Sequence, residues 1–351
     1  METTTFKLTL ELQSPFVTPM QSDTLFGQLI WMVRHSSGES AAAKFIGEVV
    51  NGGGILSVSA GLPHDKIPLP FIPASDDKTA NLLRVFQEAR SKVPGSRRAE
   101  YYSVRYLKAV KKSFGYADAA LFYSGSGLKC LGDITSGGIV PDMESAVSFV
   151  KKPVSSFLPA DAAVMKKATV TRNVINRLTG CTGEGSLFET ENEFYKPGSL
   201  KDVYIRTNLL LESDLAGYFK AMGIYGFGAD ATTGKGRFKV SGIEKCTFEN
   251  QEGAEYVLTL GSCIPAKDEA ELEASYYSVF VKRGKMGGEH AGGVPEKTGS
   301  FFKVPLLMLK EGALLKVKEK KQVYGKLEQN VNAHIPEAVQ SGQCFGPLVK
   351  L

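Results

Sequence analysis

Alternating apolar and polar residues near the N-terminus predict the first strand, at residues 6–12. Leucine and methionine then recur at helical spacing over residues 24–35, which predicts an amphipathic helix with Ser22 or Asp23 as its N-cap. A run of β-forming residues at 55–60, preceded by three glycines, predicts the second strand. The chain therefore begins with the order strand, helix, strand.

The same order returns far downstream. A strand is predicted at residues 203–211, a capped helix follows it, and a last strand is predicted at 238–243. Two strand-helix-strand units joined by a long excursion are typical of the ferredoxin-like plan. We therefore expect an N-terminal ferredoxin-like domain over residues 1–247, interrupted by an insertion at about residues 61–199.

Residues 248–351 predict a second, smaller domain. Four short runs rich in Tyr, Val, Phe and Leu are strand candidates, and paired glycines between them predict turns. This pattern indicates a mostly β unit of a degenerate ferredoxin-like type. The expected fold class is therefore α+β, with two ferredoxin-like (RRM-like) domains.

Within the insertion, residues 170–189 predict a long β-hairpin, or thumb, that turns on three glycines. Arg172 and Arg177 lie in it among hydroxyl, amide and β-branched residues. One interpretation is a basic hairpin that grips a nucleic-acid backbone. In the alternative interpretation the arginines form only surface ion pairs. The available partners are nearby glutamates, namely Glu184, Glu189 and Glu191.

A glycine-rich loop occupies residues 226–238. Its four glycines alternate with hydroxyl and basic residues: Gly226, Gly228, Gly234 and Gly236 with Thr232, Thr233, Lys235 and Arg237. Because glycine accepts positive φ, we expect the backbone to approach a ligand with its N–H groups pointing outward, which suits phosphates. The spacing does not fit a Walker loop, and the order helix, loop, strand does not fit a dinucleotide fingerprint. The alternative is a flexible connector.

Composition and charge narrow the class of protein. The chain has 351 residues, of which 43% are hydrophobic and 23% charged, as in ordinary globular proteins. No run approaches the apolar length of a membrane span, and the N-terminal residues do not resemble a signal peptide, so we expect a cytoplasmic protein without a membrane partner. The five cysteines form no Cys-x-x-Cys pair, so neither a disulfide framework nor a cysteine zinc site is indicated. The net charge of +5 is mild, but lysines and arginines concentrate in the middle of the chain, which favours an acidic partner such as nucleic acid.

Three sequence blocks together carry a family resemblance. They are Ser22–Gly27 at the start of the first helix, Arg172–Phe188 in the hairpin, and Gly226–Phe238 in the glycine loop. In this order they resemble the RAMP superfamily of CRISPR antiviral-defence proteins, and within it the fourth subunit of the type III-A Csm effector complex. Residues 61–165 contain no matching block.

The resemblance implies a non-catalytic subunit that holds crRNA. Such subunits grip the repeat-derived 5′ tag of the crRNA, dock against the large polymerase-like signalling subunit, and contact a backbone subunit. Their hairpin wedges against the guide–target RNA duplex, and the resemblance implies no cofactor or metal. The RNA-binding candidates in the matched blocks are Ser22, Arg172, Asn173, Arg177, Thr179, Gly226, Gly228, Thr232, Thr233, Gly234, Lys235, Gly236 and Arg237.

Two other functions remain open at this stage. A crRNA-processing endoribonuclease of the same superfamily would use a histidine near the first helix, and His35 lies at the end of that helix. The alternative role for His35 is a cation at a helix C-terminus. The sequence shows no His, Asp and Glu cluster with metal-ligand spacing, and the other three histidines are scattered. A plain interaction scaffold would leave the glycine loop and the basic hairpin unexplained.

Overall fold

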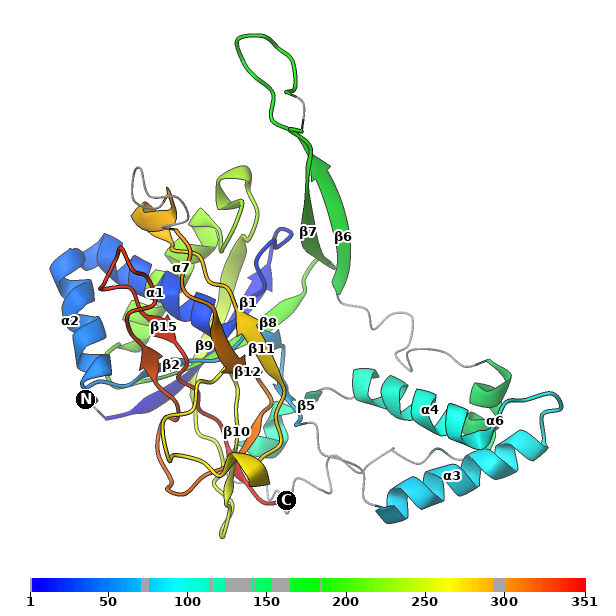
Figure 1. Cartoon of the computed structure of the whole chain (residues 1–351). Helices are drawn as coiled ribbons and strands as arrows, with labels where there is room; N and C mark the ends of the chain where they lie inside the picture. Colours follow the sequence, from blue (N-terminus) through cyan, green and yellow to red (C-terminus); the bar gives the residue numbers. More distant parts are fainter. Residues whose placement is uncertain are drawn as a thin grey trace.

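The α+β class is confirmed by a computed structural model, which describes residues 2–70, 76–113, 116–123, 141, 143–152, 165–183, 185–292 and 301–351. Figure 1 shows a body of sheets and helices, a long hairpin that projects from it, and a group of helices to one side. No helix among these residues is long and apolar enough to cross a membrane.

The central sheet is organised around its first strand. Strand β1 (Thr4–Leu12) pairs antiparallel with β8 (Leu200–Thr207) on one side and with β9 (Phe238–Cys246) on the other. Strands β2 (Leu56–Val58) and β3 (Leu62–Pro63) both pair with β8, and the main path runs β2-β8-β1-β9. The two strand-helix-strand units predicted from the sequence therefore share one sheet.

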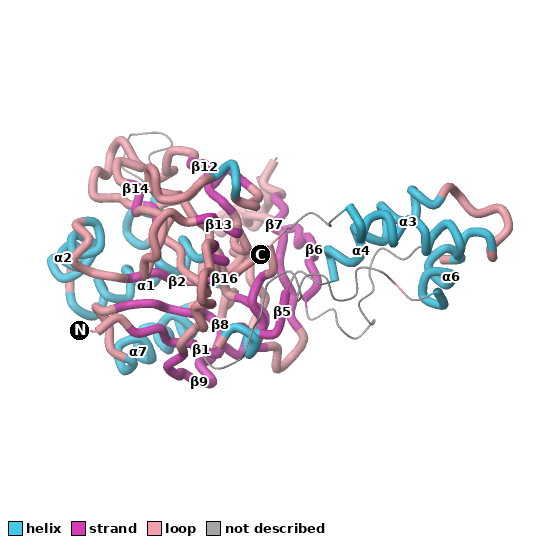
Figure 2. The backbone as a smooth tube through the Cα atoms, turned by 90° about the horizontal axis from the view of Figure 1, so that it is seen from below, coloured by secondary structure: helices cyan, strands magenta, loops and turns pink. Residues whose placement is uncertain are grey.

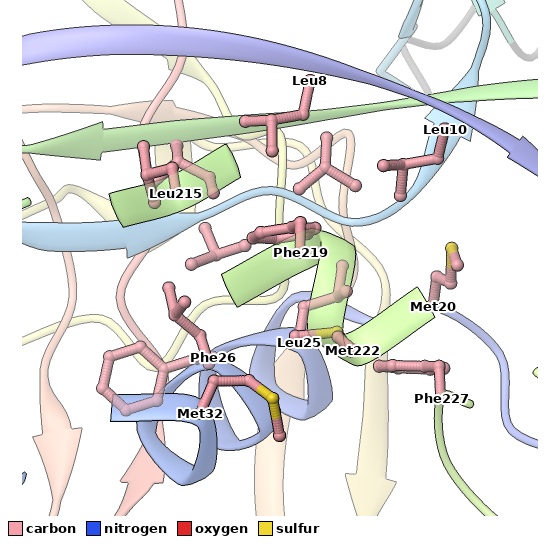
Figure 3. Packing of buried hydrophobic residues seen from close by; sticks show 14 of the residues in the cluster. Leu8, Leu10, Met20, Leu25, Phe26, Met32, Leu215, Phe219, Met222 and Phe227 are labelled. Atoms are coloured by element: carbon pink, nitrogen blue, oxygen red, sulfur yellow. The ribbon is translucent and has the colours of Figure 1, made fainter. Parts of the chain in front are cut away.

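Helices cover one face of this sheet. Helix α1 (Ser22–Ser37) and helix α7 (Glu212–Tyr225) turn their apolar sides toward it, and α2 (Glu39–Val50) packs beside α1. Figure 3 shows their side chains meeting those of β1. Each fully buried side chain of this kind contributes about 1.5–3 kcal/mol. The labelled core residues are Leu8, Leu10, Met20, Leu25, Phe26, Met32, Leu215, Phe219, Met222 and Phe227.

The other face of the sheet is covered by the C-terminal part of the chain. A three-stranded sheet of β13 (Leu314–Lys316), β10 (Tyr256–Leu258) and β16 (Leu348–Val349) lies there. Its apolar residues share a buried cluster with Tyr204 of β8. The cores on either side of the predicted boundary at residue 248 are therefore continuous.

Two short ribbons complete the C-terminal part: β11 (Val279–Lys282) with β12 (Leu306–Leu309), and β14 (Leu327–Glu328) with β15 (Gln340–Ser341). The described residues after 247 also form 3-10 turns at Leu272–Ala274 and Gly288–Gly292. They contain no α-helix, so they fit a mostly β unit, and the expected second ferredoxin-like domain is not confirmed. The apolar runs in this part of the chain are interrupted by glycine and proline. They are therefore too short to form a stable helix.

The insertion contains a separate group of helices. Strand β4 (Lys66–Pro68) pairs with β5 (Tyr116–Asp118), and a 3-10 turn follows at Ala119–Phe122. Helices α3 (Asp76–Ser91), α4 (Ala99–Ser113) and α6 (Met143–Lys151) pack on one another and are called the helical unit below. Figure 2 shows this unit beside the body.

The start of α1 differs from the predicted capping. The N-cap position is Gln21, without a side-chain cap, and Ser22 and Asp23 are the first residues of the helix. Ser22 Oγ accepts a hydrogen bond from Ser262 N (2.9 Å), and Asp23 pairs with Lys282 Nζ (2.8 Å). Both side chains therefore interact with the C-terminal part of the chain. They do not cap the N–H groups at the start of the helix.

An ion cluster around the buried side chains of Lys7 and Asp202 joins β1, β8 and β9 to the turn before β4. Lys7 Nζ lies 2.6 Å from Asp65 Oδ1, 3.6 Å from Asp202 Oδ2 and 3.3 Å from Glu244 Oε1. Burial alone would lower the pKa of Lys7, but the Asp65 hydrogen bond and the Asp202 charge outweigh it and raise that pKa. Lys7 is therefore charged, and it neutralises the fully buried Asp202.

Replacing Lys7 should expose the dependence of the sheet on this cluster. Lys7→Met leaves the Asp202 carboxylate buried without its cation, so we expect the free energy of unfolding to fall by about 3–5 kcal/mol in urea denaturation. The double variant Lys7→Met, Asp202→Asn should recover part of that loss. Lys239→Met, at an exposed site on β9, is the control and should change stability by about 0.5 kcal/mol or less. A Lys7 variant as stable as this control would contradict the argument.

Candidate nucleic-acid interface

The glycine loop is folded on itself and on the segment after β1. Phe227 N donates to Gly236 O (2.8 Å), and Gly236 N donates to Pro15 O (2.9 Å). The N–H groups of Ala229 and of residues 233–237 also have partners within the protein. The expectation that the loop's N–H groups point outward is therefore wrong for most of them, because they close the loop.

The glycines of the loop have different roles. A Cβ on Gly228 would meet the Thr18 side chain, one on Gly236 would meet the Phe227 backbone, and one on Gly226 would approach Lys235 O. Gly234 has φ +86° but faces open space. Three of the four glycines are thus required by packing within the protein, whereas Gly234 is required by its backbone conformation alone.

Several side chains of the loop do reach solvent. Thr232, Thr233 and Arg237 are exposed, and Lys235 is half-buried. Lys235 Nζ lies 5.8 Å from the ring centroid of Phe194, a residue of the neighbouring hairpin. The chemistry available to a ligand at this loop is therefore that of hydroxyl and cationic side chains.

A β-hairpin is present, but most of its strand residues lie outside the predicted range of 170–189, which covers mainly the tip. Strands β6 (Met165–Arg172) and β7 (Phe188–Tyr195) pair antiparallel from Met165↔Tyr195 to Arg172↔Phe188. Figure 1 shows the hairpin extending well away from the body. The described residues of its tip are largely exposed, including the RNA-binding candidates Asn173, Arg177 and Thr179.

The tip also presents apolar side chains to solvent. Leu178 is 97% exposed, and its neighbours Val174, Ile175 and Leu187 are more than half exposed. Asn176 shapes the turn, since its Oδ1 accepts from Leu178 N (2.9 Å). An ordered turn that exposes such residues is typical of a surface that is covered in an assembly.

Phe16 anchors both the hairpin and the glycine loop. Its N–H donates to Glu193 O (3.0 Å), and Glu193 N donates back to Phe16 O (2.7 Å). Its ring, 1% exposed, packs edge-on against Tyr195 at 5.9 Å and lies 6.4 Å from the Phe227 ring. Sequence reasoning missed this residue, because one aromatic residue in a loop carries no periodic signal.

An ion pair joins the two elements directly. Arg172 Nη1 lies 2.7 Å from Asp230 Oδ2, and the two side chains are 22% and 28% exposed. The expected partners were glutamates of the hairpin, but Glu191 pairs with Lys167 at 2.9 Å, and Glu184 lies outside the described residues. Arg172 is therefore committed to the glycine loop, whereas Arg177 is exposed at the tip.

Ser22 is the predicted site residue that the structure places elsewhere. It is 3% exposed, and its hydroxyl is bound by Ser262 N. It therefore connects α1 to the C-terminal part of the chain and has no surface to offer to RNA.

The structure also gathers a group that the sequence did not reveal. His64 Nδ1 lies 2.9 Å from Asp202 Oδ1, and Asp65 completes a set of possible metal ligands. The sequence shows no such cluster at metal-ligand spacing, because Asp202 joins His64 and Asp65 from a distant strand. Lys7 Nζ already lies 2.6 Å from Asp65, so the ammonium group supplies the positive charge that a metal ion would bring.

Comparisons with known proteins place this architecture. No protein-family profile matches the chain, and no curated protein shows significant sequence similarity to it. A chain in a structure of the Csm1-Csm4 cassette in complex with cA4 has a TM-score of 0.51 at 14% identity, over 99% of this chain and 98% of that one. The protein therefore shares its fold with a chain of the Csm1-Csm4 cassette.

Two other solved structures match with TM-scores of 0.49 and 15% identity. One is the Csm1-Csm4 cassette in complex with AMPPNP, over 100% of this chain and 99% of that one. The other is the Csm3-Csm4 subcomplex of the type III-A CRISPR-Cas interference complex, over 97% of this chain and 99% of that one.

The different roles of the loop glycines can be tested by single alanine substitutions. Gly234→Ala adds a methyl in open space, so we expect only the strain of a left-handed residue, about 1–2 kcal/mol. Gly228→Ala adds the same strain and a clash with Thr18, so its loss of stability in urea denaturation should be larger. Gly217→Ala, on an open position of α7, is the control and should leave stability unchanged or raise it by up to about 1 kcal/mol. Equal losses at Gly228 and Gly234 would refute the packing argument.

Proposed function

We propose that this chain is a non-catalytic crRNA-binding subunit of a type III-A CRISPR (Csm) interference complex. In this role it holds the repeat-derived 5′ tag of the crRNA and joins the large polymerase-like signalling subunit to the backbone subunits. The observation that carries the proposal is the union of hairpin and glycine loop through Phe16 and the Arg172–Asp230 pair. Two of the three sequence blocks that resemble RAMP proteins thereby form one surface.

The fold supports the same conclusion. We interpret the β2-β8-β1-β9 sheet with α1 and α7 on one face as the ferredoxin-like domain of a RAMP protein, and the projecting β6–β7 hairpin as its thumb. A fold shared with a chain of the Csm1-Csm4 cassette agrees with this interpretation. By analogy with that assembly, one proposed protein partner is a Csm1-like signalling subunit. The other, a backbone subunit, is proposed from the resemblance of the sequence blocks.

The exposed chemistry suits RNA. Arg237 and Arg177 offer guanidinium groups to phosphates, and the threonines of the loop can bond to sugar or phosphate oxygens. At the tip, Leu178 and its apolar neighbours could insert beside an unstacked base, as apolar wedges do between base steps. The target RNA would then lie near the tip, and the loop would face the crRNA backbone.

We propose no catalytic role for His35. Its ring lies 6.0 Å from the Trp31 ring, in the last turn of α1. No acidic side chain among the described residues pairs with it, and general acid–base cleavage of RNA would need a second proton-transfer group. This geometry favours a helix-end residue.

The roles of the two hairpin arginines should separate in RNA titrations. Arg177→Ala should weaken binding of labelled single-stranded RNA across sequences alike and reduce the salt slope by about 0.7, the value for one phosphate contact. Arg172→Ala and Asp230→Asn break the same ion pair, so they should weaken binding to the same degree without a matching change of slope. An unchanged slope for Arg177→Ala would remove the hairpin tip from the RNA site.

The proposed absence of catalysis is tested at His35. His35→Ala should leave RNA binding intact and lower stability by at most about 0.3–1 kcal/mol, the contribution of a helix-end charge. The measurement is cleavage of labelled precursor crRNA by the wild-type chain and the variant. Cleavage by the wild type that His35→Ala abolishes would establish the endoribonuclease instead.

A further inference from the structure

The positive charge of this protein is concentrated in the helical unit. Residues 76–113 and 143–152 contain twelve Lys and Arg residues against five Asp and Glu residues, a net charge of +7. Since the whole chain carries +5, the remainder of the molecule carries −2. The mid-chain basic residues noted in the sequence thus belong mainly to one structural unit.

The unit keeps these charges outside because it has an apolar core of its own. Phe86, Tyr106 and Phe149 come from its three helices, with ring centroids 5.4–5.9 Å apart. These residues form a buried cluster that is distinct from the other buried clusters of the molecule. The opposite sides of the helices are consequently free to carry charge.

Several basic side chains of the helical unit are exposed and have no acidic partner in the part of the unit that the structure describes. Lys92 pairs with Glu88 at 3.4 Å. Six other residues are exposed and have no carboxylate within ion-pairing distance among the described residues: Arg84, Arg90, Arg97, Arg98, Lys151 and Lys152. Interspersed acidic residues are the ordinary way to balance such a surface. Their scarcity here leaves an attractive potential for anions.

The connection between α3 and α4 holds its arginines in place. The Arg97 guanidinium lies 4.6 Å from the Tyr101 ring centroid, and Arg105 Nη1 donates to Tyr101 Oη (2.7 Å). Arg97 N also donates to Tyr102 Oη (3.1 Å). A guanidinium held against an aromatic ring loses less entropy when it binds, and its planar fork matches a phosphate.

The basic surface extends from this connection to α6. Lys92 and Lys151 line the same surface pocket, together with Glu144, although they belong to different segments of the chain. A surface of this kind differs from the centre of a protein–protein interface, which is depleted in charge and enriched in aromatic residues. A polyanion with evenly spaced phosphates fits it better than an acidic protein does.

We propose that the helical unit is a second RNA-contacting surface of this protein, which binds the phosphate backbone of single-stranded RNA without reading its sequence. It is separate from the hairpin and glycine loop and does not rest on their role. Phosphate contacts release counterions, so the signature of this surface is a salt-dependent affinity.

The test removes charge from the helical unit of the full chain. The variant R97Q/R98Q/K151Q/K152Q is titrated with labelled single-stranded RNA of mixed sequence at several salt concentrations. We expect weaker binding at every salt concentration and a slope of log K against log salt that is smaller by up to about 3, the sum of four phosphate contacts on a single strand. Thermal denaturation checks that the variant remains folded.

A matched control removes four positive charges elsewhere. The variant K267Q/K310Q/K318Q/K320Q neutralises exposed lysines of the C-terminal part of the chain and should keep a slope close to that of the wild type. If both variants lower the slope equally, net charge explains the effect and the proposal is overturned. If the helical unit binds an acidic protein instead, the variant R97Q/R98Q/K151Q/K152Q should show the wild-type slope of log K for RNA against log salt. That result also overturns the proposal.

Arg177→Ala, measured in parallel, separates this inference from the proposed function. A reduced slope for Arg177→Ala beside an unchanged slope for the helical variant refutes the second surface and supports the hairpin. The reverse pattern supports the second surface and removes the hairpin tip.

Discussion

The pairing of β1 with both β8 and β9 is the constraint on which the rest of the structure depends. A strand from the first dozen residues lies between two strands that follow the whole insertion. The chain must therefore leave the sheet after β2 and return to it at β8. Lys7 stabilises this arrangement at its centre, where one ammonium group faces carboxylates from three other segments.

The same strand also places the candidate interface. Phe16 follows β1 closely, and its ring lies between Tyr195 of the hairpin and Phe227 of the glycine loop. Any shift of β1 would move both elements, and the Arg172–Asp230 pair links them again on the outside. The glycines of the loop serve this packing more than they serve a ligand, since most of their N–H groups have partners within the protein. Only the exposed side chains are then available to contact RNA. They extend from a loop and a hairpin whose backbones are held by packing within the protein.

Local patterns predicted the elements well where one physical rule dominated. The alternation over residues 6–12 and the helical spacing over 24–35 correspond to β1 and α1, because burial of one face imposes a period on the sequence. The hairpin was predicted at 170–189 from β-forming runs around glycines, but its strands extend from Met165 to Arg172 and from Phe188 to Tyr195, mostly outside that range. The caps of α1 were wrong, because Ser22 and Asp23 found stronger partners in the C-terminal part of the chain. The C-terminal strands were predicted as short runs, but the described residues after 247 contain no α-helix, so a second ferredoxin-like unit is not confirmed.

The sequence by itself determined the α+β class, the projecting hairpin, the glycine loop and the basic middle of the chain, since each depends on residues close together in the chain. Only the tertiary structure decided which candidate residues meet. It committed Arg172 to Asp230 and left Arg177 exposed, buried Ser22, and gathered His64, Asp65 and Asp202 around Lys7. These outcomes depend on segments far apart in the chain that approach within a few ångströms. Ion pairs and buried contacts form between groups that folding brings together. They cannot be predicted from the spacing of residues within one segment.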